Sequence, residues 1–474
     1  MTHTHNAKTL ARMIVTALAA ISVVASSALG QVTNAPAADP DPMDAFRTDK
    51  GLISLTKVAP GLTPVSDYTG DFWNRATLFG DPGGWRSRLY DQGITLDAQL
   101  TQVYQGVVSG GPADSPGARY WGLLDYGATF DTAKLGLWSG GLFVANAETS
   151  FGNSLLGRSG NASPVNYLST RPEVGTPATF LMEYYYTQAL PAGASLILGR
   201  LNATNFLDKN RFANDPRNQF LNLSMDNDPL FGAFVSFSTY AAFADIPVTK
   251  FFHIQPAVWD PNIQPGDYGS TFFKNVGTGA QAELSWTLGD TLGGVLRPVA
   301  LWTSKPTTDI SNPKLPLDIL TGQPVAKKDG NYMVHLNFEQ YLWKPDVPAD
   351  APKPARTAVY DFQERGIGVF TRFGWAPEGR NAFTIYLGGG VGGRGVFDSR
   401  PYDRFGLGVY WLKASSDLVA NVRGLLRDEV GFEAFYNVAL TPWLTLAGDL
   451  QWIKSAITRN GDAVVLGLRL GTVF

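Results

Sequence analysis

The chain of 474 residues contains 38 Lys and Arg and 41 Asp and Glu, which gives a formal net charge of −3. This balance excludes a typical nucleic-acid-binding protein, which would carry a basic excess, and 51 glycines with 12% aromatic residues exclude a disordered chain. Because the chain has no cysteine, it also has no disulfide framework, no thiol catalysis and no cysteine-bound zinc.

Residues 1–30 have the features of a cleaved secretory signal peptide. Lys8 and Arg12 precede the apolar stretch 13–25, and ALG at residues 28–30 offers a small-x-small cleavage pattern. About 13 apolar residues are too few to cross a bilayer as a helix, and no later stretch reaches the required length of about 18. We therefore expect an exported chain that is soluble in the periplasm, secreted, or an outer-membrane barrel.

Residues 31–79 are a predicted linker, or short N-terminal periplasmic segment, because they are rich in Pro, Asp and Gly and lack a clear hydrophobic period. After two further glycines, residues 85–92 are expected to form a short helix that Gly93 ends in a left-handed cap. From Ile94 the hydrophobic period changes to two, which is typical of a strand.

This alternation recurs to the end of the chain in segments of about ten residues. In residues 332–341, for example, Val334 and Leu336 alternate with His335 and Asn337. Segments with one apolar and one polar face, separated by turns, are the sequence signature of a transmembrane β-barrel. We count about sixteen of them, which start near residues 94, 120, 140, 180, 194, 231, 251, 278, 294, 332, 363, 382, 404, 429, 443 and 463.

The last segment, residues 463–474, carries Leu466 and Leu468 on an apolar face and Gly467 and Arg469 on the other. A membrane barrel would turn the apolar face to lipid and Arg469 into a wet lumen. In lipid, the last strand leaves no open edge only if it pairs with the first strand. We therefore predict an all-β fold, a transmembrane antiparallel β-barrel of about 16 strands whose two ends meet.

The predicted barrel covers residues 80–474 and lies in the bacterial outer membrane. Its connections alternate between tight turns, such as LPAGA after Ala189, and long loops rich in Gly, Asn and Pro, such as 202–230. This alternation is typical of periplasmic turns and external loops. Between residues 304 and 404, the expected strands leave long connections at both ends of the barrel, so we expect one strand boundary there to be misplaced.

Four stretches of the chain share the motifs of one family: GDPGGWRSRLYDQGI at 80–94, SRPYDRFGLGVYW at 399–411, EVGFEAFYNVALTPWLTLAGDLQWI at 429–453 and NGDAVVLGLRLGTVF at 460–474. They resemble the carbohydrate-selective outer-membrane porins of the OprB type, with Pro82 in the place of an aromatic residue. The likeness spans about residues 70–474 and implies a sixteen-stranded barrel with passive, sugar-preferring diffusion. It also implies that the aromatic C-terminal Phe474 is read by the barrel-assembly machinery.

Two further motifs are compatible with other protein classes. The glycines of residues 388–393 match G-x-G-x-x-G, but they lie in an alternating segment with no helix after it, which favours strand glycines over nucleotide binding. His335 and Asn337 share one face and, with Ser285, could supply a hydrolase site. Polar lining of a lumen is the simpler interpretation of these residues and of paired carboxylates. We therefore expect no catalytic site, no metal site and no cofactor.

The inward faces carry acidic, basic and aromatic side chains together. Neutral sugars are bound by planar hydrogen-bonding groups and aromatic faces, and both signs of charge on one wall suit a neutral polar solute. We expect a water-filled barrel for passive diffusion of mono- and small oligosaccharides and other small polar solutes. The candidate pore-lining and sugar-contact residues are Glu183, Glu283, His335, Glu339, Arg372, Tyr386, Arg394, Glu433, Asp449 and Arg469.

Three alternative functions stay open at this point: an outer-membrane barrel hydrolase, an anion-selective general porin and a secreted soluble β protein that binds sugar. The expected partners are outer-membrane lipid, small sugars as permeants and the barrel-assembly machinery, with no nucleic acid. Monomer and homotrimer also stay open, as do the preferred sugar and the loop that constricts the pore.

Overall fold

The computed structural model describes residues 70–113, 117–171, 178–270, 272–289, 291–346 and 365–474. Within these residues, sixteen strands form a closed antiparallel barrel, as predicted. The predicted signal peptide, residues 1–30, and residues 31–69 lie outside the described part of the chain, so both assignments stay predictions. The barrel strands are β1 (Ile94–Gly111), β2 (Ala118–Asp131), β3 (Gly141–Gly152), β4 (Ala178–Ala189), β5 (Ser195–Leu201), β6 (Thr239–Thr249), β7 (Phe252–Trp259), β8 (Gly277–Leu288), β9 (Leu292–Thr303), β12 (Asn331–Trp343), β13 (Gly366–Trp375), β14 (Phe383–Arg394), β15 (Arg404–Ala414), β16 (Glu429–Thr441), β17 (Leu444–Lys454) and β18 (Gly461–Val473).

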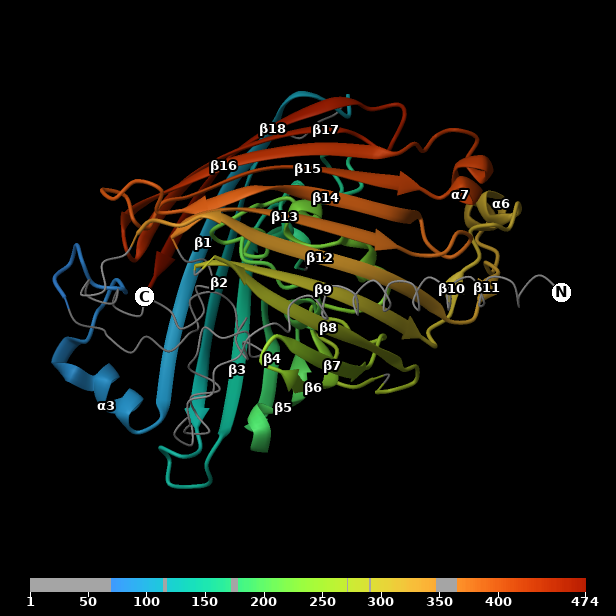
Figure 1. Cartoon of the computed structure of the whole chain (residues 1–474). Coiled ribbons are helices and arrows are strands. Elements are labelled where there is room, and N and C mark those ends of the chain that lie inside the picture. The colour runs from blue at the N-terminus through green and yellow to red at the C-terminus, as the bar shows by residue number, and fades with distance from the viewer. Residues whose placement is uncertain (1–69, 114–116, 172–177, 271, 290, 347–364) are drawn as a thin grey trace. The chain divides into compact units, whose positions relative to one another are not determined.

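The barrel closes because its first and last strands pair (Figure 1). β1 and β18 run antiparallel, with Gln99 opposite Val473 and Val103 opposite Arg469. This pairing confirms the prediction that the two ends of the barrel meet. It leaves no barrel strand with a free edge, which is the condition for a sheet that spans lipid.

The two faces of the strands separate as the alternation predicts. In β18, Leu466 and Leu468 are 49% and 56% exposed on the outer surface, whereas Val465 and Arg469 are buried on the inner face. The same pattern of alternate burial runs through β17, where the outward residues from Leu444 to Trp452 are apolar or small and only the terminal Lys454 is charged. An apolar outer surface and a polar inner surface are what a barrel in lipid requires.

We call the end of the barrel where β1 begins and β18 ends the seam end, and the opposite end the far end. Most connections at the seam end are short, such as those between β8 and β9 and between β16 and β17. The far end carries longer connections, which contain α6 (Leu315–Thr321), α7 (Ser416–Asn421) and a hairpin of β10 (Thr307–Thr308) and β11 (Lys327–Lys328) (Figure 1). None of the described helices is long and apolar enough to cross a membrane.

One predicted strand start is wrong. The strand expected near residue 231 begins at Thr239, because Pro229–Ala233 forms the short 3-10 helix η4, which Asp228 caps by accepting a hydrogen bond from the main-chain N–H of Leu230. The other fifteen starts agree with the predicted ones within three residues.

The boundary that we expected to be misplaced between residues 304 and 404 is not. β12, β13 and β14 begin at 331, 366 and 383, close to the predicted 332, 363 and 382. The connection 344–365 therefore joins β12 to β13 at the seam end, and the regular alternation of short and long connections is broken there.

The seam itself is covered by the segment that precedes β1. This segment contains α3 (Trp85–Asp91), and its Arg86 Nη2 donates to the main-chain oxygen of Phe474 at 2.8 Å. The same nitrogen lies 3.4 Å from the carbonyl oxygen of Leu96 in β1. The ring of Phe79 stacks on that of Phe474, with 5.7 Å between centroids. Both edges of the seam therefore contact one segment.

Candidate pore constriction

The connection between β5 and β6, residues 202–238, folds into the barrel, and we call it the inserted segment. It contains η4 and two single-turn helices, α4 (Thr204–Leu207) and α5 (Leu223–Asp226), and most of its residues are buried. The side chain of Asn222 starts α5 by accepting a hydrogen bond from the main-chain N–H of Ser224. Polar caps of this kind let a chain make short turns in place of a long helix.

Apolar side chains of the inserted segment pack against inward-facing rings of the barrel wall. The ring centroids of Phe212 and Tyr341 are 4.9 Å apart, and so are those of Phe220 and Phe435. All four residues belong to one buried apolar cluster inside the barrel. Burial of each such ring stabilises the packed state by roughly 1.5–3 kcal/mol, so the inserted segment is held as part of a core.

A fully buried polar cluster around Asp208 also holds the inserted segment. The Asp208 Oδ1 atom accepts hydrogen bonds from Arg372 Nε and Asn337 Nδ2, both at 2.7 Å. His335 lies between two carboxylates, with Nε2 3.1 Å from Asp208 Oδ1 and Nδ1 2.9 Å from Asp228 Oδ2. Burial alone would raise the pKa of Asp208, but Arg372 and His335 hold that pKa below its ordinary value. The cluster therefore joins β12 and β13 to the inserted segment through ionic hydrogen bonds.

A second cluster lies around Arg297 of β9. Its guanidinium donates to Glu283 Oε2 at 2.7 Å, to Glu339 Oε1 at 3.2 Å and to the carbonyl oxygen of Lys209 at 2.9 Å. Glu339 also accepts a hydrogen bond from the main-chain N–H of Arg211 at 2.5 Å. Two wall carboxylates, Glu283 and Glu339, thus share one wall arginine. Arg297 and Glu339 bind the inserted segment directly, and Glu283 is connected to the segment through Arg297.

Elsewhere on the wall, an acid of β16 and a base of β18 bind the backbone of the inserted segment. Glu433 accepts hydrogen bonds from the main-chain N–H groups of Leu221 at 2.5 Å and Asn222 at 3.0 Å. Arg469 donates to the carbonyl oxygen of Gln219 at 2.7 Å. Buried backbone groups must be hydrogen bonded, and here the wall supplies the partners that a regular helix would supply internally.

The structure thus gives a position to each of the ten candidate residues. Besides these contacts, Glu183 Oε1 accepts from the main-chain N–H of Asn202 at 2.9 Å, and the Tyr386 hydroxyl donates to the carbonyl oxygen of Ser224. The candidates that bond directly to the inserted segment are Glu183, His335, Glu339, Arg372, Tyr386, Glu433 and Arg469. Glu283 reaches it through Arg297, Asp449 accepts from Gln451 at 2.9 Å, and Arg394 lies 5.7 Å from the ring of Tyr402. Their contact with sugar stays a prediction.

A group of charged residues that the sequence did not single out lies in the same interior. Arg171 makes two parallel hydrogen bonds to Glu148, Nε to Oε2 at 2.7 Å and Nη2 to Oε1 at 3.0 Å. Arg217 donates to Asp125 Oδ2 at 2.8 Å and reaches Glu148 Oε1 at 3.3 Å. Both arginines lie in loops, where no period of two assigns a face, so the sequence alone held no signal for them.

Two aromatic rings adjoin this group. The Arg171 guanidinium lies 5.5 Å from the ring centroids of both Tyr167 and Phe237, which are 5.3 Å from each other. Together with Glu183 these side chains line a small polar hollow. Burial raises the pKa of Tyr167 to about 12, although Arg171 opposes the shift, so its hydroxyl stays protonated near neutral pH. Planar donors, carboxylates and aromatic faces can together bind a polyhydroxylated ring.

The structure also places the motifs that pointed to other protein classes. The glycines of residues 388–393 lie within β14, each paired with β13 or β15, and not in a loop that opens a helix. Both ring nitrogens of His335 contact carboxylates, so neither is left to activate Ser285. No group of three or more His, Asp or Glu side chains in the described ranges is arranged to hold a metal ion.

A family model described as "Carbohydrate-selective porin, OprB family" matches residues 115–474. The chain belongs to the OprB porin family. It is therefore a carbohydrate-selective porin of the bacterial outer membrane, and its family consists of channels.

Relatives of this OprB-family chain agree with the assignment. It is 26% identical to Porin B of Pseudomonas aeruginosa over 466 residues, which cover 90% of this chain and 95% of the relative. It is 32% identical to the putative porin QuiX of Acinetobacter baylyi over 107 residues, 22% of this chain and 24% of the relative. A solved structure of Pseudomonas putida OprB superposes with a TM-score of 0.71 at 22% identity, over 85% of this chain and 100% of the other, which supports the fold.

Proposed function

We propose that this OprB-family porin selects neutral mono- and small oligosaccharides at the group formed by Asp125, Glu148, Arg171 and Arg217 with the ring of Tyr167. Transport is passive: solutes diffuse through the water-filled barrel, with no energy input, cofactor or bond-making step. The observation that carries the proposal is the parallel pairing of Arg171 with Glu148 beside two aromatic rings. Planar donors and acceptors next to ring faces match the alternating hydroxyl and C–H surfaces of a sugar.

The pairing of charges favours a neutral solute over an anion. An anion-selective pore needs cationic groups whose field is not cancelled by nearby acids. Here each arginine of the group is within hydrogen-bond distance of a carboxylate, Arg171 of Glu148 and Arg217 of Asp125. Such pairs still offer hydrogen bonds to hydroxyl groups while their net field is small.

A hydrolase is disfavoured by the surroundings of its would-be base. A base must accept a proton from the nucleophile over a hydrogen bond, and the two ring nitrogens of His335 already contact Asp208 and Asp228. The family context, a family of channels, argues in the same direction. We therefore propose that the chain has no enzymatic activity.

The proposed partners beyond sugar are outer-membrane lipid around the strands and the barrel-assembly machinery at the C-terminus. Phe474 follows directly on β18, the strand that closes the barrel, and its main-chain N–H donates to Ala98 of β1 at 2.9 Å. An aromatic residue at this position is available for recognition before the seam forms. The protein works in this proposal as a single barrel, with association into trimers a separate property.

The test is electrical. The full mature protein is reconstituted in a planar bilayer, and the ionic current is recorded while glucose, maltose or maltotriose is added. We expect sugar-dependent block of the current with weak preference between potassium and chloride. Arg171→Gln should weaken the block at least about tenfold, since a hydrogen bond to a charged group contributes about 1.5–3 kcal/mol.

The matched control is Arg459→Gln, an identical change at an exposed position in the connection between β17 and β18. It should leave the block unchanged. Heat-dependent migration on gels should show that both variants are folded. A folded wild-type channel that is strongly chloride selective and indifferent to sugar would overturn the proposal in favour of the anion-selective alternative.

A further inference from the structure

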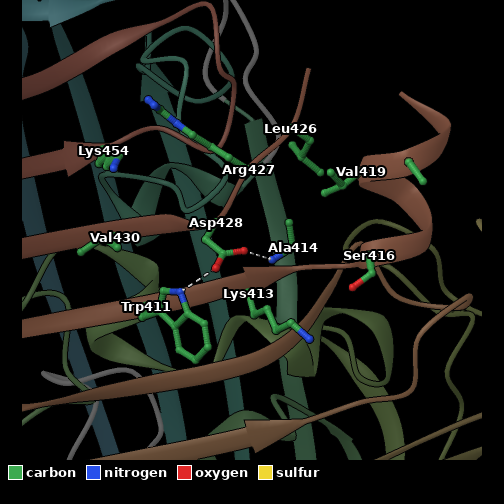
Figure 2. Close-up of a pocket in the computed structure, with 11 residues that line it drawn as sticks. Trp411, Lys413, Ala414, Ser416, Val419, Leu426, Arg427, Asp428, Val430 and Lys454 are labelled. Carbon is green, nitrogen blue, oxygen red and sulfur yellow. Dashed lines mark hydrogen bonds between the residues drawn. The ribbon is translucent and has the colours of Figure 1, made fainter. Parts of the chain in front are cut away.

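An outward-facing hollow of about 730 Å³ lies at the far end of the barrel, between the ends of β15, β16 and β17 and the connection that carries α7 (Figure 2). We call it the rim hollow. Its wall includes Trp411 and Lys413 of β15, Val430 of β16 and Lys454 of β17, and Arg427 enters from the connection. These strand residues alternate with inward-facing ones, so they lie on the surface that faces lipid.

The rim hollow sits directly beside the apolar band of the barrel. Trp411 pairs with Val430, which pairs with Lys454, so the three form one row across three strands. The next outward-facing row toward the middle of the barrel consists of Val409, Phe432 and Trp452. That row is wholly apolar, and Val409 is 57% exposed. The row that ends in Lys454 is therefore the first row with a charged residue above the hydrocarbon, at the depth of lipid head groups.

Three cationic side chains line the rim hollow, and their acidic neighbours bind them loosely. Lys413 Nζ lies 3.5 Å from Glu378, and Arg427 Nη2 lies 3.8 Å from Asp462, which is exposed. The side chain of Lys454 is exposed, and within the described ranges its ammonium group makes no ion pair. Pairs of this length at exposed groups contribute little, so the amines and the guanidinium are available to another anion.

The acid at the centre of the rim hollow, Asp428, is already satisfied. Its Oδ2 accepts from Trp411 Nε1 at 3.1 Å and its Oδ1 accepts from the main-chain N–H of Ala414 at 2.9 Å, as the dashed lines in Figure 2 show. These two donors disperse the carboxylate charge and fix the indole against the strand. Asp428 therefore does not neutralise the cations around the hollow, of which Arg427 is also anchored by its Nε, which donates to the carbonyl oxygen of Ser455 at 2.8 Å.

We propose that the rim hollow binds a phosphate-bearing lipid of the outer leaflet. The phosphate lies among Lys413, Arg427 and Lys454, and an acyl chain lies along Trp411 and the apolar row below it. A soluble anion would use only the cations, whereas a lipid uses the cations and the adjoining apolar band at once. The charge complementarity, the depth of the row that ends in Lys454 and its continuity with the lipid-facing surface together favour this occupant.

The experiment titrates the full mature protein, in a neutral detergent, with bisphosphorylated lipid A and with its dephosphorylated counterpart, and counts bound lipid by native mass spectrometry. We expect tight binding of the phosphorylated lipid only. Lys413→Gln combined with Lys454→Gln should weaken it by about thirty-fold, since each lysine near a membrane surface contributes a factor of about five. The control pair Lys314→Gln and Lys327→Gln removes two exposed charges elsewhere at the far end and should bind like the wild type.

Three outcomes would overturn the proposal: equal affinity for the phosphorylated and dephosphorylated lipids, equal affinity of the rim-hollow variant and the control variant, or full competition by inorganic phosphate at the concentration of the lipid. Heat-dependent migration of the variants separates loss of binding from loss of folding. Sugar block of the current should be unchanged in the rim-hollow variant, so this test and the test of the channel fail independently.

Discussion

The two sides of the barrel use the same alternation of residues for different purposes. The inner faces of β3 to β7, β9 and β12 to β16 contribute rings and aliphatic groups, such as Phe243, Trp259 and Phe370, to the apolar cluster that holds the inserted segment. β1, β2, β17 and β18 contribute none to this cluster, although Val103, Trp121 and Leu123 form a smaller one with Leu221 of the inserted segment. On β1, side-chain oxygens of Gln99 and Thr101 make no hydrogen bond within the described part of the chain. Inward positions of the strands that build the large cluster are therefore core positions, whereas β1 also keeps inward polar groups that water or solute can bind.

Arg372→Gln should have the largest effect on the stability of the barrel, because it breaks the fully buried ion pair between Arg372 of the wall and Asp208 of the inserted segment. The change leaves Asp208 without its 2.7 Å guanidinium partner and removes the bond to the carbonyl oxygen of Met225. Breaking a buried pair by removing one partner costs about 3–5 kcal/mol. Urea unfolding of the barrel, together with proteolysis of the inserted segment, measures it. Stability equal to that of Arg459→Gln would show that the segment is held mainly by its rings.

The assignment of the outer face to lipid can be tested separately from the packing inside the barrel. Leu466→Arg places a charge on the lipid-facing surface and should destabilise the barrel by about 2–4 kcal/mol near mid-bilayer. Leu466 is 49% exposed, while Thr445 of the neighbouring strand points inward. Thr445→Arg should cost less. Folding efficiency into vesicles, followed by urea titration, compares the two; equal losses would contradict the assigned sidedness.

A matched pair of glycine substitutions compares the two sides directly. A Cβ atom at Gly374 of β13 would collide with the carboxylate of Asp228, which is fixed in the cluster around His335, whereas a Cβ atom at Gly467 of β18 would come no closer than 3.4 Å to another atom. Gly374→Ala should cost about 1–3 kcal/mol through overpacking, and Gly467→Ala should be tolerated. Thermal unfolding followed by circular dichroism gives both values. Tolerance of Gly374→Ala would mean that the inserted segment yields easily.

The smallest expected effect on stability is that of Arg394→Gln. Arg394 lies near the seam end of β14, where its guanidinium is 5.7 Å from the centroid of the Tyr402 ring. The change should alter stability by no more than about 0.5 kcal/mol while it shifts the reversal potential of the open channel toward cations. A loss of stability comparable to that of Arg372→Gln would show that Arg394 also helps to hold the inserted segment.

The sequence predicted those features of the fold that follow from the alternation of side chains along a strand. Fifteen of the strand starts, the outward position of Leu466 and the pairing of β1 with β18 all follow from alternation and from the need to leave no open edge in lipid. The inward position of Arg372 and Glu433 follows from the same rule. Their partners could not be predicted, because the rule gives a direction and not what lies in that direction.

The inserted segment was out of reach for a physical reason. Its turns depend on single caps such as Asn222 and Asp228 and on packing against distant strands, neither of which has a period. The strand that we expected near residue 231 illustrates this, since an apolar stretch there reads like a strand but forms η4 inside the barrel. Arg171 and Arg217 were missed for the same reason.

The position of Arg86 has a consequence for the order of events during assembly. Its guanidinium contacts the main-chain oxygens of Leu96, on the first strand, and of Phe474, after the last one. Neither contact alone identifies a finished barrel, but both together exist only when the first and last strands lie side by side. The segment around α3 can therefore make its full set of contacts only after the barrel has closed. Reopening of the seam would break the contacts of this segment with Phe474, which an open barrel cannot make. The segment thus stabilises the closed barrel and need not act on the steps that lead to closure.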